Sequence, residues 1–492
     1  MTFSIFLRTW ISKARSFLHA EQGMTLPLLA VSMVVVVGTV GLAIDTARLQ
    51  LVQSKLQFSL DAAGLAAGSD AALANVNTDV QKYLYANFNG YLGASISGTT
   101  SSLDTTGSII SLTAQATLPT TFLGVVGVTV MTANAASQIT RNQTGVELVL
   151  VLDNTGSMDD TAGGGVSKIQ ALKTASTLLV NDLFGSTTVS TNGKLWVGVV
   201  PFSQTVNIGT SHPTWMNATY DATLTDWGPG GSWFGCVDAR LNGEDVVDDP
   251  PVQGTPSTLF EQYYWTSDNL NTDGVSNSSY NVWKTPHLSH GVTTYTYASP
   301  LNETNKGPNL LCPQQITPMT NDSSVVLSAI NSMTAQGDTL INQGLVWGWN
   351  MISPRWQGLW GGTMNANGLP LAYHTTNMNK VVVLLTDGYN TIDNLAHGGY
   401  WFLGDNRAGS TNGTTAVNNL DTRTLEVCTA MKAQGIYIYT IALGTDTDAT
   451  SLALLQNCAT SGDYYFNSPS TTQLNAIFST IAGSLSHLRV SK

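Results

Sequence analysis

Oxygen-bearing side chains follow an apolar, strand-like segment in the first half of the chain. Val146–Leu152 reads VELVLVL, and Asp153, Thr155 and Ser157 come directly after it. Side chains at positions i, i+2 and i+4 of a turn can converge on one point, and open α/β sheets bind ligands beyond the carboxyl ends of their strands. One carboxylate and two hydroxyls, with no His or Cys nearby, favour Mg²⁺, Mn²⁺ or Ca²⁺ over Zn²⁺.

Two more candidate ligands lie far along the chain. Asp387 ends the apolar run KVVVLLTD and precedes a glycine, and Thr339 follows Gly337-Asp338 at the start of a helical pattern. The alternative is that the first turn is only a helix cap of the Asx or ST type. The turn residues Asp153, Thr155 and Ser157 are therefore candidate ligands of a divalent cation, and Thr339 and Asp387 are further candidates.

The sequence offers no catalytic group beside this site. We expect no His, Lys or Cys next to it, which leaves the carboxylates as the only general bases. No GxxxxGK[ST] loop is present, so no nucleotide is expected. We therefore predict that the protein is not an enzyme, and a metal-dependent hydrolase is the least favoured alternative.

Strand and helix patterns alternate around the candidate ligands. Short apolar runs rich in β-branched residues are typical of strands buried on both faces, and strands that alternate with helices predict a mostly parallel, doubly wound α/β sheet. The expected strands are Val146–Leu152, Leu195–Phe202, Lys380–Thr386 and Ile436–Leu443. The expected helices are Lys168–Leu183, Thr339–Ile352 and Leu425–Gly435. The aromatic and Pro/Gly-rich stretch at about 207–320 breaks this rhythm and is interpreted as an insertion.

A membrane helix is predicted near the amino terminus. Residues 25–44 contain no charge, and at about 1.5 Å per residue a helix of this length spans about 30 Å of hydrocarbon. Arg8, Lys13 and Arg15 precede it, so the positive-inside rule places residues 1–24 in the cytoplasm and the rest outside. A cleaved signal peptide is the alternative, although its apolar core is normally shorter.

A stalk and a small α+β unit are expected at residues 45–145. Leu49, Val52, Leu56 and Leu60 continue the helical pattern beyond the membrane. Alternating Ser/Thr-rich segments between about 95 and 140 then predict strands.

Composition and cysteines are consistent with an exported protein. The 492 residues carry a formal net charge of −12, which argues against nucleic-acid binding, and only 11% of them are charged. The four cysteines can form two bridges in an oxidising compartment. Cys428 and Cys458 flank one predicted strand, and Cys236 and Cys312 enclose most of the insertion, so we predict these two pairs; free buried thiols are the alternative.

The motifs DNTGSM, GDT and LLTDG, in that order, resemble the von Willebrand factor A fold with its metal-ion-dependent adhesion site. That resemblance implies that the five candidate ligands surround one cation, with Thr155 standing where Ser is commoner. The parts expected are a cytoplasmic tail (1–24), a transmembrane helix (25–44), the stalk unit (45–145) and an A-type domain (146–492) that contains the insertion.

The chain as a whole resembles the TadG-like proteins of bacterial tight-adherence (Flp) pilus loci. The motifs are the single amino-terminal membrane helix, LQFSLDAAGLAAG, PTTFLGVVGV, the A-type domain and the carboxyl-terminal YYFNSPSTTQLNAIFSTIAGSLSHLR. This resemblance implies a single-pass inner-membrane protein whose large domain is periplasmic or surface-exposed. It also implies that the metal site binds a protein partner, either a pilus or envelope component or a host surface ligand.

A minor pilin-like subunit is the alternative function. In that case the apolar helix would pack into a filament, and prepilins carry Glu where this chain has Leu28.

Overall fold

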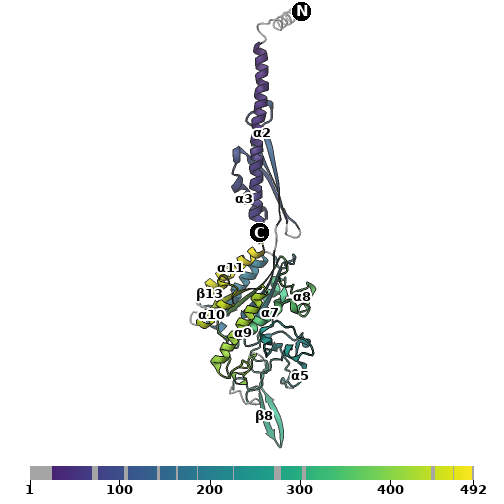
Figure 1. Ribbon diagram of the computed structural model, residues 1–492, viewed down its shortest axis with the longest axis vertical. Helices are drawn as coiled ribbons and strands as arrows, with labels where there is room; N and C mark the ends of the chain where they lie inside the picture. The colour runs from purple at the N-terminus through teal and green to yellow at the C-terminus, as the bar shows by residue number, and fades with distance from the viewer. Residues whose placement is uncertain are drawn as a thin grey trace, which may run out of the picture. The chain divides into compact units, whose positions relative to one another are not determined.

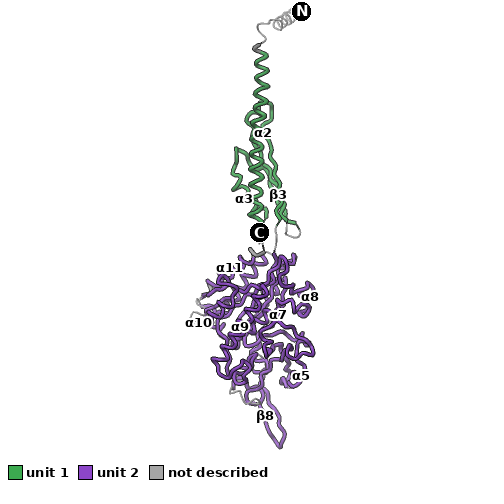
Figure 2. Tube along the Cα trace, viewed as in Figure 1, with its two compact units in different colours: residues 1–141 green, residues 142–492 purple. Residues whose placement is uncertain are grey.

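The chain divides into two compact units, Met1–Arg141 and Asn142–Lys492, which we call the amino-terminal unit and the α/β unit (Figure 2). The computed structural model describes residues 25–68, 76–104, 109–140, 144–161, 165–185, 187–224, 226–270, 279–301, 306–444, 449–468 and 470–489. The predicted cytoplasmic tail, with Arg8, Lys13 and Arg15, lies outside the described residues.

A single long helix, α2 (Thr25–Gly68), is the central element of the amino-terminal unit. It contains both the predicted membrane segment and the predicted stalk without a break, and it is long and apolar enough to cross a membrane. Beyond the apolar segment, Val52, Leu56 and Leu60 are fully buried against the rest of the unit. Their spacing of four residues places them on one face of the helix.

An antiparallel three-stranded sheet packs on this buried face of α2. Its order is β1-β2-β3, and Leu112 and Ala114 of β2 point into the shared core. The remaining elements of the unit are α3 (Val76–Phe88), β1 (Ser95–Leu103), β2 (Ile109–Pro119), the 3₁₀ turn η2 (Leu123–Val126) and β3 (Val130–Thr140). The predicted small α+β unit is therefore present.

A six-stranded mixed sheet forms the centre of the α/β unit. Its order is β10-β5-β4-β11-β12-β13, in which β10 pairs antiparallel to β5 and the other neighbouring pairs are parallel. The strands are β4 (Gly145–Asp153), β5 (Leu195–Phe202), β10 (Thr317–Thr320), β11 (Met378–Thr386), β12 (Tyr437–Leu443) and β13 (Tyr465–Ser468). The four predicted strands are thus the four central ones.

Helices cover both faces of this sheet (Figure 1). Leu148 and Leu150 of β4 pack towards α4 and α11, whereas Val149 and Val151 pack towards α7, as the alternation of a strand requires. The helices are α4 (Lys168–Phe184), α5 (Ala218–Asp221), α6 (Ser323–Ser332), α7 (Ile341–Ile352), α8 (Gly362–Ala366), α9 (Gly413–Ala433), α10 (Ala449–Cys458) and α11 (Thr471–Arg489).

Helix α7 is buried along its whole length and lies unusually close to the sheet. A Cβ atom on Gly344 would come within 2.5 Å of the Phe202 ring, and one on Gly348 within 2.5 Å of a Val151 methyl. These two glycines therefore let the helix backbone approach β4 and β5 directly, which fixes the position of the loop that precedes α7.

The segment expected to be an insertion is packed rather than separate. Trp215 and Phe260 join the main core, and Tyr263 and Trp265 form a smaller core around the Cys236–Cys312 disulfide. Edge strand β10 lies within the range expected for the insertion and belongs to the main sheet. The other strands of the segment are β6 (Val206–Asn207), β7 (Cys236–Val237) and the exposed hairpin β8 (Lys284–Ser289) and β9 (Val292–Tyr297).

Candidate metal centre

The turn after β4 presents the first three predicted ligands. Asp153 is fully buried, and its Oδ1 accepts a hydrogen bond of 2.8 Å from the backbone N–H of Thr155. The chain then forms a 3₁₀ turn, Gly156–Asp159, which is anchored in the core by the fully buried Met158. The hydrogen bond to Asp153 and the buried Met158 side chain hold the chain in a sharp turn. The hydroxyl oxygens of Thr155 and Ser157 consequently lie 3.1 Å apart.

The loop before α7 is attached to the same turn. The N–H of Gly156 donates to the carbonyl of Gly337, and the N–H of Gln336 donates to the carbonyl of Asn154, each at 2.8 Å. Thr339 lies in this loop, because helix α7 begins at Ile341 rather than at the predicted Thr339.

Strand β11 brings the last predicted ligand to the same edge. Ser157 Oγ donates to Asp387 Oδ1 at 2.8 Å, and Thr386 Oγ1 donates to Asp153 Oδ2 at 2.5 Å. Gly388 is the residue after Asp387. A Cβ atom placed on Gly388 would lie 3.8 Å from Thr339 Oγ1. The structure therefore brings Asp153, Thr155, Ser157 and Asp387 together at the carboxyl ends of β4 and β11, and it places the hydroxyl of Thr339 beside the residue that follows Asp387.

Three of the candidate ligands have oxygen atoms within hydrogen-bonding distance of one another. Neighbouring ligands of an octahedral Mg²⁺ at 2.0–2.1 Å lie about 2.9 Å from one another. The Thr155–Ser157 and Ser157–Asp387 oxygen distances, 3.1 and 2.8 Å, are close to this value. Within the described part of the chain, no three His, Cys, Asp or Glu residues form a group that could hold a metal, so the hydroxyls are essential to this set. Such a set of carboxylate and hydroxyl oxygens suits a hard divalent cation such as Mg²⁺, Mn²⁺ or Ca²⁺.

The site concentrates negative charge in a buried place. Burial, together with the nearby carboxylate of Asp387, raises the pKa of Asp153 to about 7. A buried carboxylate pair of this kind is relieved by a proton or by a cation. Burial likewise raises the pKa of Asp338, which precedes the Thr339 ligand, to about 6.

Lys168 is the functional residue that sequence reasoning missed. Its Nζ donates to Asp387 Oδ2 at 2.7 Å, so the expectation that no lysine lies beside the site is wrong. Lys168 begins α4, where the positive end of the helix dipole opposes a cation. A lysine in the first turn of a helix is unfavourable unless an acid lies next to it, so the sequence carried a signal for this contact.

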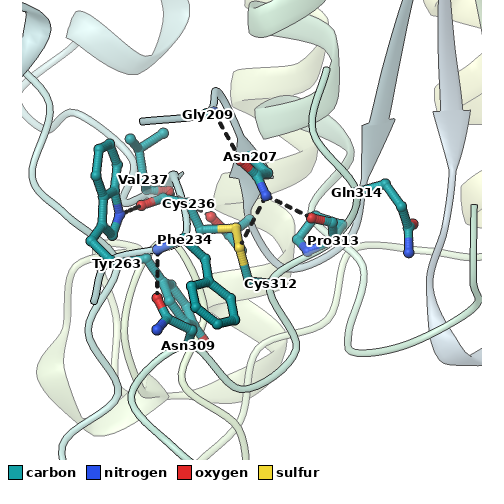
Figure 3. The surroundings of a disulfide bond; sticks show 12 residues. Asn207, Gly209, Phe234, Cys236, Val237, Tyr263, Asn309, Cys312, Pro313 and Gln314 are labelled. Atoms are coloured by element: carbon teal, nitrogen blue, oxygen red, sulfur yellow. Dashed lines mark hydrogen bonds between the residues drawn. A yellow bond between two sulfur atoms is a disulfide. The ribbon is translucent and has the colours of Figure 1, made fainter. Parts of the chain in front are cut away.

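The Cys236–Cys312 disulfide, whose surroundings Figure 3 shows, is hydrogen-bonded through its own backbone to the loop that contains Thr339. Gln336 Nε2 donates to the carbonyl of Cys312 at 2.8 Å, and the side chain of the nearby Gln314 accepts from Asn154 Nδ2 at 3.0 Å. The carbonyl of Pro313, the residue after Cys312, accepts a hydrogen bond of 2.9 Å from Asn207 Nδ2. The bridge therefore connects the packed insertion to the backbone of the candidate metal site.

The second predicted disulfide is also present. Cys428 of α9 and Cys458 of α10 are bonded, with their Cα atoms 5.1 Å apart. The structure thus pairs the four cysteines as the sequence predicts.

One protein family matches part of the chain. Residues 23–70 match the model described as "Putative Flp pilus-assembly TadE/G-like". This range covers the whole of α2. A comparison with curated proteins gives no match.

Solved structures of pilus proteins resemble this chain weakly. The von Willebrand factor domain of the type V pilus tip protein Mfa5 from Porphyromonas gingivalis is 11% identical, with 71% of this chain and 97% of that one covered and a TM-score of 0.36. The pilus adhesin SpaC from Lactobacillus rhamnosus GG is 14% identical, with 80% and 34% covered and a TM-score of 0.35. A variant of the PilB minor pilin from Streptococcus sanguinis is 12% identical, with 80% and 78% covered and a TM-score of 0.33. At such low TM-scores we base no conclusion on these likenesses.

Proposed function

We propose that this protein is a membrane-anchored envelope component of a tight-adherence (Flp) pilus system that binds a partner protein through a divalent cation. The observation that carries the proposal is the convergence of two carboxylates and three hydroxyls at the carboxyl ends of β4 and β11. The family match at residues 23–70 supports the connection with pilus assembly.

In this proposal the α/β unit has the von Willebrand A fold. Its first strand, β4, lies inside the sheet between β5 and β11, and the edge strand β10 is antiparallel. The strand order of a doubly wound sheet reverses beside its first strand, and ligands bind at that place. The candidate ligands lie there.

The proposed chemistry is binding rather than catalysis. The chain's own hydroxyls and carboxylates would hold Mg²⁺, or Mn²⁺ or Ca²⁺, and the cation would accept a carboxylate from a partner protein at a remaining coordination position. Ser157 is solvent-exposed, so a partner can reach this side of the site. The partner is a pilus or envelope component, or a ligand on a host surface.

The proposed location is the bacterial inner membrane, with residues 25–44 as a single span and the α/β unit periplasmic or surface-exposed. The length and apolar character of α2 support the span, and the basic residues of the tail support its orientation. The two disulfides suit an oxidising compartment on the far side of that membrane.

The test is thermal unfolding of the full chain in detergent, with EDTA or with Mg²⁺ or Mn²⁺. Tryptophan fluorescence reports on the α/β unit, because every tryptophan except Trp10 lies between Trp196 and Trp401. Cation binding should stabilise the folded protein by about 2.7 kcal/mol when its concentration is a hundred times the dissociation constant. Asp153→Asn should abolish this gain, and Ser157→Ala should reduce it.

Asp159→Asn is the matched control, because Asp159 is an exposed acid of the same turn that is not among the predicted ligands. It removes the same charge and should keep the full response. A melting temperature that no divalent cation changes would show that the turn is only structural.

A further inference from the structure

An apolar turn connects β2 to β3 and lies beside the membrane segment of α2. We call residues 120–129 the apolar turn. Val125 is 82% exposed and Val126 is 62% exposed, and no charged residue occurs between positions 105 and 140. Exposed valines at the tip of a turn are unfavourable in water, where turns are normally polar.

The apolar turn and α2 together form a groove of about 340 Å³. Its walls come from Met33, Val34 and Val37 of the helix and from Phe122, Val125 and Val126 of the turn. Val37 is seven residues before the end of the predicted span, or about 10 Å inside it. The turn therefore lies level with part of the segment that would be in hydrocarbon.

Most backbone N–H groups of the apolar turn are hydrogen-bonded within the protein. Buried Asp45 accepts hydrogen bonds from the N–H groups of Thr121, Phe122 and Leu123 at 3.0, 2.9 and 2.9 Å. Further bonds stay within the turn: Thr120 N–H to Thr129, Val125 N–H to Phe122, Gly127 N–H to Gly124 and Val128 N–H to Leu123. Each unpaired backbone group is costly in hydrocarbon, so these bonds lower the cost of placing the turn there.

Charge and packing fix the turn at this depth. Arg48 lies 3.5 Å from Asp45 and donates to the carbonyl of Leu92, which keeps the ionic pair at the outer end of the span. A Cβ atom on Gly41 would come within 2.5 Å of Phe122 Cβ, so the glycine allows the turn to lie directly on the helix.

We propose that the apolar turn inserts into the outer leaflet of the bilayer beside α2, and that lipid acyl chains fill the groove between them. The occupant is lipid because the groove is continuous with the lipid-facing surface of the spanning segment and its rim carries no charge. The amino-terminal unit is then anchored in the membrane by two elements, the spanning helix α2 and the inserted apolar turn. This inference rests on the membrane anchor of the proposed function and is independent of the metal site.

Single-cysteine spin labelling tests the insertion in the full-length chain. The four native cysteines are all bridged, so an introduced cysteine is the only free thiol. Val125→Cys probes the turn, Val34→Cys is the reference for the span, and Phe58→Cys is the aqueous reference on the same helix. Each labelled protein is reconstituted into vesicles of phosphatidylethanolamine and phosphatidylglycerol. Accessibility to oxygen and to a water-soluble nickel chelate is then measured.

The ratio of oxygen to nickel accessibility for Val125→Cys should equal that of Val34→Cys and exceed that of Phe58→Cys severalfold. A ratio like that of Phe58→Cys would overturn the inference, since the turn would then be in water. Low accessibility to both reagents would also overturn it, because protein would cover the groove. If Val34→Cys itself were aqueous, the anchor of the proposed function would fail together with the inference.

Discussion

Buried acids and a lysine lie at each end of the β4–β11 strand pair, with different consequences. At the amino ends, Glu147 and Lys380 are both buried and form an ion pair. The Leu371 N–H donates to Glu147 Oε1 at 2.7 Å, and Lys380 Nζ donates to the carbonyl of Ile352 at 2.9 Å. One positive charge meets one negative charge there.

At the carboxyl ends, two acids share one lysine. Lys168 pairs with Asp387, and Asp153 has only neutral hydrogen-bond donors from Thr155 and Thr386. When both acids are ionised, this end keeps one negative charge more than it neutralises. In the proposed function, this excess of negative charge, rather than the presence of buried acids alone, is what suits the carboxyl end to an added cation.

The ionisation of the two ends follows the same contrast. Burial raises the pKa of Glu147 and lowers that of Lys380, while the attraction between the two groups opposes both shifts. For Asp153, burial and its acidic neighbour act in the same direction. At the amino end, the charges of Glu147 and Lys380 therefore neutralise each other. At the carboxyl end, the excess negative charge can be neutralised by a proton or by a metal ion.

Removing the lysine at the amino end should have the largest effect. Lys380→Met leaves Glu147 buried without a counter-charge, which should cost about 3–5 kcal/mol of unfolding free energy. Urea unfolding followed by tryptophan fluorescence measures this loss.

The double variant Glu147→Gln/Lys380→Met is the control for that loss. It removes both charges at nearly constant volume and should recover most of the stability. Its Mg²⁺ response should match that of the unchanged protein. A single variant within 1 kcal/mol of the parent would mean that water reaches the amino end.

The two disulfides should separate stability from cation binding. Replacing both cysteines of either pair with serine should cost about 2–4 kcal/mol, because bridges across 76 and 30 residues both restrict the unfolded chain. Only loss of Cys236–Cys312 should also weaken Mg²⁺ binding, since Gln336 of the Thr339 loop donates to the Cys312 carbonyl.

Mg²⁺ titrations monitored by melting temperature measure the difference between the two bridge variants. Cys428–Cys458 is the matched control, because it joins α9 to α10. Equal loss of cation affinity in both variants would refute the bracing role of the first bridge.

The central strands were predictable because their residues are buried on both faces, which leaves uninterrupted apolar runs in the sequence. The start of α9 was not: its first turns, from Gly413, are rich in Thr and Asn and lack apolar periodicity. Asn412 caps that helix through a bond from the Thr415 N–H, a local signal that periodicity does not reveal. Strand β10 was hidden for another reason, because it is only four residues long and lies at the sheet edge.

The candidate ligands were predictable from residue type and order, whereas their charge balance was not. Asp153 and Asp387 both end apolar strands, and parallel strands place such residues at one edge. Lys168 lies in another element, and its contact with Asp387 depends on how α4 crosses the sheet. Such a tertiary contact leaves only the weak signal of a lysine at the wrong end of a helix.

Removing Lys168 should give the smallest effect and the sharpest test of the charge count. In Lys168→Met, no ammonium opposes an added cation and Asp387 Oδ2 loses its donor. Charges about 4 Å apart near a protein surface interact by roughly 1–4 kcal/mol. At the lower end of that range, Mg²⁺ affinity should rise about tenfold, which corresponds to about 1.4 kcal/mol. The cation-free protein should melt at a lower temperature, because two acids then lie together unpaired.

Lys173→Met is the matched control for Lys168→Met. Lys173 also lies on α4, and its Nζ donates to the carbonyl of Asn331 at 3.0 Å rather than to a carboxylate. It removes the same charge from the same helix, so any general electrostatic effect of the substitution should appear in both variants. Isothermal titration with Mg²⁺ measures the two affinities. Equal affinities would mean that Lys168 does not compete with the cation, and the excess negative charge would then not explain why this end of the sheet binds it.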